Sequence, residues 1–219
     1  LGEDRGHWEG RHFFHRRHRR KFMVLIGAGA LWCVWAGLAL LSKAVFGYGL
    51  LVGVLVGAYF ILTVDARRKG SLSLGKNLVA AVAFAMGVAS AAHAYAPFLS
   101  MGGMLTEVEL WLFAALCFWN ISAIDFWVLA PEDEEDASGL LAFGTLAVAA
   151  VAMFFASRVG IYQRPYFYAV LVGVAALYFL NRCRGNFSME ARRVLVDVAL
   201  LLPPTVYWFW MRLYVVGVL

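Results

Sequence analysis

The feature that most constrains this chain is a series of seven long apolar runs. A helix rises about 1.5 Å per residue, so roughly 20 apolar residues cross a hydrocarbon core of about 30 Å. None of the runs alternates with the period of two that a transmembrane strand needs. The sequence therefore predicts an all-α, polytopic bundle of transmembrane helices, with spans at residues 22–41, 44–64, 78–97, 110–130, 139–157, 165–181 and 194–216.

Composition indicates a membrane protein, and the cysteine spacing gives no sign of zinc or redox chemistry. Hydrophobic residues make up 63% of the chain and charged residues only 15%, whereas soluble domains are about half apolar and a quarter charged. The cysteines Cys33, Cys117 and Cys183 lie far apart without zinc or redox spacing, so they indicate neither chemistry. We predict two regions, a cytoplasmic basic juxtamembrane segment at 1–21 and a transmembrane helical domain at 22–219.

Basic residues predict the orientation of the bundle. Most of the 19 lysines and arginines fall in the N-terminal segment and in the connections after the second and sixth spans. The positive-inside rule places these regions in the cytoplasm, so we expect the N-terminus inside and the C-terminus outside. The basic, histidine-rich stretch 10–22 is typical of a segment attracted to anionic membrane lipids. An anion site there remains an alternative, and nucleic acid is not an expected partner.

The connection between the second and third spans, at the predicted cytoplasmic face, could bind a phosphorylated ligand. Arg67, Arg68 and Lys76, between the second and third spans, suit phosphate oxygens, since Arg binds them with a bidentate fork and Lys as a point charge. The same residues are also explained as charges that set the orientation, and by itself the phosphate interpretation does not outweigh this one.

The fourth span ends in polar residues and an acidic run. Asn120 and Asp125 lie within about 140° of each other on a helix, so both can face the bundle interior. Mg²⁺ prefers carboxylate and other oxygen ligands, which makes Asp125, with Asp133 and Asp136 from the run 132–136, the predicted metal site. The run by itself is also typical of a solvated turn, whereas Asp125 is embedded in apolar sequence.

His93 is an ionisable residue inside the third span. Such residues are expensive in a membrane and are often functional. Ala89, one turn earlier, leaves room for a flat macrocycle, so His93 is a possible pigment or haem ligand. The alternative is a histidine near the helix end that bonds to a neighbouring helix.

Three stretches together resemble a known family: "RHFFHRRHRR", "YFILTVDARRKGSLSLGKNLVAAVAFAMGVA" and "LCFWNISAIDFW". In this order the chain resembles the UbiA-type intramembrane prenyltransferase superfamily, particularly its divergent bacterial members. The resemblance implies a bacterial inner membrane protein whose seven spans are the third to ninth helices of that fold. It also implies Mg²⁺ at Asp125 and an isoprenoid diphosphate at the basic residues and Asn120.

The chain departs from the family at both aspartate motifs. Leu129 stands where the second motif has its second aspartate, and the first motif is expected to lie before Leu1. Two functions therefore stay open. One is a prenyltransferase that moves an isoprenoid chain from its diphosphate to an aromatic or lipid acceptor. The other is a non-catalytic subunit of a photosynthetic or respiratory membrane complex that holds lipid, quinone or pigment.

Overall fold

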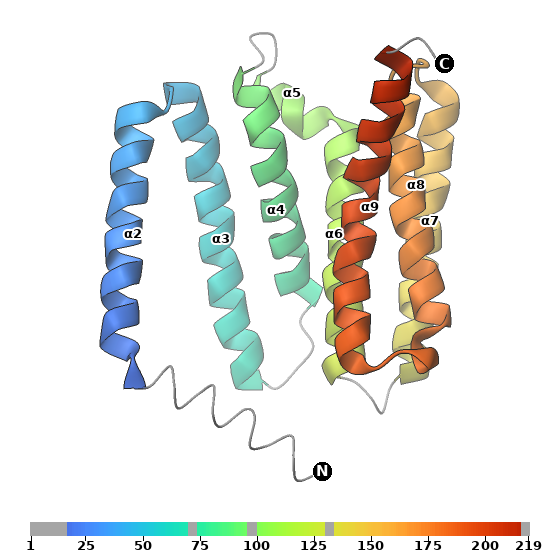
Figure 1. Ribbon diagram of the computed structural model, residues 1–219, viewed down its shortest axis with the longest axis horizontal. Coiled ribbons are helices and arrows are strands. Elements are labelled where there is room, and N and C mark those ends of the chain that lie inside the picture. Colours follow the sequence, from blue (N-terminus) through green and yellow to red (C-terminus); the bar gives the residue numbers. More distant parts are fainter. Residues whose placement is uncertain (1–16, 70–73, 96–99, 130–133, 216–219) are drawn as a thin grey trace. The chain divides into compact units, whose positions relative to one another are not determined.

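The computed structural model describes residues 17–69, 74–95, 100–129 and 134–215. These residues are almost entirely helical and contain no strand, which confirms the all-α prediction. In chain order the helices (Figure 1) are α2 (Arg19–Leu40), α3 (Lys43–Lys69), α4 (Leu74–Tyr95), α5 (Met101–Thr106), α6 (Val108–Leu129), α7 (Glu134–Arg158), α8 (Arg164–Arg182), a 3₁₀ turn (Arg184–Asn186) and α9 (Met189–Val215).

Each of the seven predicted spans coincides with a helix. Among the described residues, six helices are long and apolar enough to cross a membrane, namely α2, α3, α4, α6, α7 and α9. α8, the predicted sixth span, has 19 residues and carries an arginine at each end, Arg164 and Arg182, and it is not among the six. The chain is therefore a multi-pass, all-α membrane protein.

The chain divides into two compact units inside α3, at Gly47 and Tyr48. Unit 1 (Leu1–Gly47) contains α2, which begins at Arg19 and buries no residue. Its apolar side chains, such as Leu25 and Trp32, are exposed, as expected of a helix whose solvent is lipid.

The core of unit 2 (Tyr48–Leu219) lies where α6, α7, α8 and α9 pack together (Figure 1). Large apolar side chains from all four helices are fully buried there, namely Leu116, Leu141, Phe167, Leu177 and Val196. Gly173 of α8 allows Pro203 of α9 to approach so closely that an added Cβ would lie 2.7 Å from the proline ring. A second cluster joins α3 and α4 to α5 and α6 through Tyr48, Met86, Met104 and Leu110.

Successive long helices of unit 2 run in opposite directions, so polar residues far apart in sequence meet at two ends. α4 begins where α6 ends, and Lys76 lies at that end. We call it the lysine end. At the opposite end, α4 finishes beside the start of α6, and His93 lies there. We call it the histidine end.

Candidate functional site

The lysine end holds an ion pair between α4 and α6. Lys76 Nζ lies 3.0 Å from Asp125 Oδ2, and the two side chains are only 19% and 18% exposed. Asn77 Nδ2 donates a hydrogen bond to the same carboxylate oxygen at 3.0 Å. Asp125, the residue predicted to bind a metal, therefore has a cation and an amide as its neighbours.

Ser122 completes this group, which we call the polar cluster: Lys76, Asn77, Ser122 and Asp125. Ser122 and Asp125 are three residues apart, so they share one face of α6. The fully buried Ser122 accepts a second hydrogen bond from Asn77 Nδ2 at 3.3 Å. Asn77 is 1% exposed, and its Oδ1 has no hydrogen-bond partner among the described residues. The cluster balances one positive and one negative charge.

The structure places only part of the predicted metal site. Asp133 lies outside the described residues, and Asp136 is placed only as a backbone position in the first turn of α7. Within the described ranges, no three His, Cys, Asp or Glu residues come together as metal ligands. A cation at Asp125 would have to compete with the ammonium group of Lys76.

The predicted diphosphate ligands do not all gather at one place. Arg67 and Arg68 fall in the last turn of α3, and their side chains lie outside the described part of the chain. Lys76 belongs to the polar cluster. Asn120, 3% exposed, instead donates from Nδ2 to the Val196 carbonyl of α9 at 2.6 Å. Asn120 and Asp125 thus both point into the bundle but contact different helices.

Replacing Asn120 by alanine is expected to lower the free energy of unfolding by about 1–2 kcal/mol, because a buried hydrogen bond between α6 and α9 is lost. Ser157→Ala is the control, since the exposed Ser157 bonds only within its own helix. Circular dichroism during denaturation in mixed micelles measures both. Unchanged stability together with lost binding of a prenyl diphosphate would contradict the structural role of Asn120.

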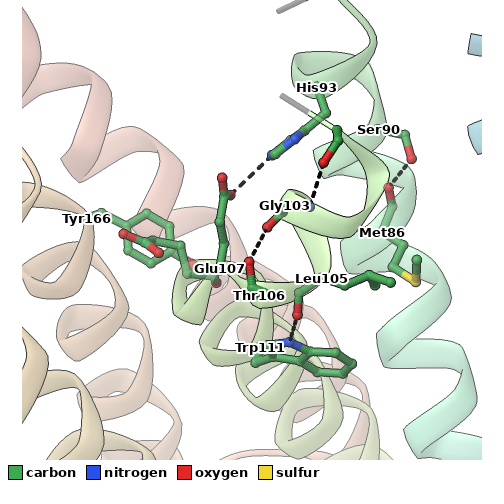
Figure 2. A network of polar contacts seen from close by, with 11 residues as sticks. Met86, Ser90, His93, Gly103, Leu105, Thr106, Glu107, Trp111 and Tyr166 are labelled. Carbon is green, nitrogen blue, oxygen red and sulfur yellow. Dashed lines mark hydrogen bonds and ion pairs between the residues drawn. The ribbon is translucent and has the colours of Figure 1, made fainter. Parts of the chain in front are cut away.

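The histidine end holds a second polar pair. His93 is 5% exposed, and its Nε2 lies 3.1 Å from Glu107 Oε2. Figure 2 draws this contact as a dashed line. Glu107 lies between α5 and α6, so the pair joins the end of α4 to the start of α6. Nearby, Trp111 Nε1 donates to the Leu105 carbonyl at 2.8 Å and Tyr166 Oη to the Glu109 carbonyl at 2.6 Å.

This geometry bears on the pigment prediction for His93. The neighbouring-helix contact that the sequence left as the alternative is present, since Nε2 faces Glu107. Nδ1 is buried and has no partner among the described residues. A carboxylate on one ring nitrogen is the usual way in which proteins orient a metal-binding histidine. Ligation of a pigment through Nε2 would require the Glu107 contact to break, so Nδ1 is the nitrogen left for a ligand.

Sequence reasoning missed three of these polar residues. They are Asn77, Ser122 and Glu107, to which the sequence analysis assigned no role. The spacing of Ser122 and Asp125 was the one available signal, because residues three apart share a helix face.

Comparisons of the chain with protein-family models, with curated proteins and with solved structures find no match.

Proposed function

We propose that this chain is a UbiA-like membrane protein that no longer transfers prenyl groups and instead holds a lipid-like molecule in the membrane. The observation that supports it is the environment of Asp125, whose carboxylate is neutralised by Lys76 and hydrogen-bonded by Asn77. We also propose that the lysine end faces the cytoplasm of a bacterial cell, because the positive-inside rule places the basic connection between α3 and α4 on that side of the membrane.

The chemistry of prenyl transfer explains why this environment matters. Departure of a diphosphate builds negative charge, which metal ions and cationic side chains must stabilise. In the polar cluster, the charge of Lys76 is already balanced by Asp125. The cluster therefore offers a diphosphate no net positive charge, and it offers Mg²⁺ a carboxylate already bound to a cation.

Prenyl transfer itself is the second candidate, and one observation favours it. Lys76 and Asp125, predicted separately as ligands of diphosphate and of metal, meet at the same end of unit 2. A Mg²⁺–diphosphate complex could separate them, with the metal at Asp125 and the phosphate oxygens at Lys76. Mg²⁺ commonly binds in this way, through one or two carboxylates plus substrate phosphates and water.

An assay for diphosphate release distinguishes the two candidates. Protein reconstituted in vesicles is mixed with Mg²⁺, farnesyl or geranylgeranyl diphosphate and aromatic acceptors. We expect no release of diphosphate above that of protein-free vesicles. Release that requires Mg²⁺, that Asp125→Asn abolishes and that Ser157→Ala retains would establish the enzyme instead.

A further inference from the structure

Asn77 leaves a buried hydrogen-bond acceptor unused in the polar cluster. Its Nδ2 donates both to Asp125 Oδ2 at 3.0 Å and to Ser122 Oγ at 3.3 Å. Turning the amide around would place Oδ1 against the Asp125 carboxylate, so the network assigns the two amide atoms. Asn77 Oδ1 therefore has no donor among the described residues, although the side chain is only 1% exposed. Buried polar atoms normally have a partner, which makes this oxygen a candidate ligand contact.

Ser122 has the opposite deficit. It is fully buried, and in the described part of the chain its Oγ takes part in one hydrogen bond, which it accepts from Asn77 Nδ2. A serine hydroxyl is a donor as well as an acceptor, so its hydrogen has no acceptor in that part of the chain. The cluster therefore lacks one donor, for Asn77 Oδ1, and one acceptor, for the hydrogen of Ser122.

A hydroxyl group matches both deficits. It is a donor and an acceptor at once, so a single hydroxyl can donate to Asn77 Oδ1 and accept from Ser122. A buried water molecule typically has about three polar partners, whereas the cluster offers these two atoms. A charged group is disfavoured, because Lys76 and Asp125 already balance each other at 3.0 Å.

The cluster is not sealed inside the bundle. Asn77 and Ser122 are buried, but the side chains of Lys76 and Asp125 beside them stay partly exposed. A ligand that enters from the membrane can therefore reach the cluster at the ion pair. Its hydroxyl group would then meet Asn77 on α4 and Ser122 on α6, the two helices that the cluster joins.

We propose that the polar cluster binds the free hydroxyl group of a neutral lipid, a diacylglycerol or a prenol, through Asn77 Oδ1 and Ser122 Oγ. The inference deepens the proposed function and rests on it for the claim that the bound molecule is lipid-like. It adds the chemistry of the polar head, which is an uncharged group that donates one hydrogen bond and accepts another.

Native mass spectrometry of the wild-type protein compares each alcohol with an analogue that lacks the hydroxyl hydrogen. The probes are dioleoylglycerol and geranylgeraniol, each with its O-methyl ether. At least one alcohol should bind about tenfold more tightly than its ether, because the ether leaves Asn77 Oδ1 without a donor. The alcohol that shows this preference identifies the class of lipid. Equal binding of alcohols and ethers, or no binding of either alcohol, would overturn the proposal.

Two leucine variants assign the preference to one side chain. Leucine is similar in size to asparagine but offers no acceptor, so Asn77→Leu should abolish the preference for the alcohol over its ether. Asn120→Leu is the matched control and should keep the preference, because this buried asparagine of α6 bonds instead to the Val196 carbonyl of α9. A preference that survives Asn77→Leu would overturn the role of Asn77.

Failure of this inference can be told apart from failure of the proposed function. If neither alcohol is preferred over its ether and no diphosphate is released, the polar cluster is not a hydroxyl site, but the absence of prenyl transfer stands. Mg²⁺-dependent release of diphosphate overturns the proposed function, whichever way the alcohols behave.

Discussion

Replacing Asp125 by alanine is expected to lower the free energy of unfolding by about 3 kcal/mol. The change removes the Asp125 carboxylate that lies 3.0 Å from the ammonium group of Lys76, a side chain only 19% exposed, and it removes the nearer of two acceptors of Asn77 Nδ2. Removing one partner of a buried ion pair typically costs 3–5 kcal/mol, and partial exposure places this pair at the lower end. Denaturation in mixed micelles, followed by circular dichroism, measures the loss.

Glu190→Ala is the matched control for this prediction. Glu190 is an exposed acid in the first turn of α9, and substitutions at such positions usually change stability by less than about 0.5 kcal/mol. If Asp125→Ala were as harmless as Glu190→Ala, the ion pair would contribute nothing to folding and the structural interpretation of Asp125 would be wrong.

Gly144→Val is expected to cost about 3 kcal/mol or more, through steric overlap between α6 and α7. The indole ring of Trp119 lies against the Gly144 backbone, in the space that a Cβ would occupy. Trp119 also packs edge to face against Phe118, with ring centroids 4.9 Å apart. Overpacking a filled site forces side chains and backbone to shift, at a cost of 1–3 kcal/mol and occasionally more, and here the blocking group is a large, rigid ring.

A second glycine of the same helix provides the control for Gly144. A Cβ added at Gly139 would meet no atom within 4 Å, so Gly139→Val should change stability little, since valine is at least as good a helix former as glycine. When Trp119→Leu is combined with Gly144→Val, the loss in free energy of unfolding caused by the valine should become smaller, because the overlapping indole ring is gone. Equal effects of valine at both glycines would show that Trp119 does not pack against Gly144.

The helices could be predicted because membrane thickness fixes their length. The predicted span 165–181 differs by one residue at each end from α8 (Arg164–Arg182). The first residue of a helix that begins in polar sequence was harder to predict. α4 begins at Leu74, four residues before the predicted 78, because Lys76 and Asn77 find polar partners on α6 and can stay helical.

The contacts of the candidate site could be predicted only in part. Short connections imply antiparallel neighbours, so the start of the third span and the end of the fourth were expected at one end. The rotation of each helix about its axis could not be predicted, because apolar residues surround these helices on all sides. For that reason the sequence allowed Asn120 and Asp125 to share a ligand, whereas the structure directs Asn120 to α9 and Asp125 to α4.

The most direct test of the structural role of Asp125 is a double-mutant cycle of Lys76→Met and Asp125→Leu. Each single variant should lose about 3 kcal/mol of stability, while the double variant should lose clearly less than the sum of the two losses, because it leaves no buried charge without its partner and only one acceptor of Asn77 is missing. Mg²⁺ with a prenyl diphosphate should leave the unfolding midpoint of wild type unchanged. Two results together would contradict the account: additive losses in the cycle, and stabilisation by Mg²⁺ and prenyl diphosphate only in proteins that keep Asp125. They would identify Asp125 as a metal ligand.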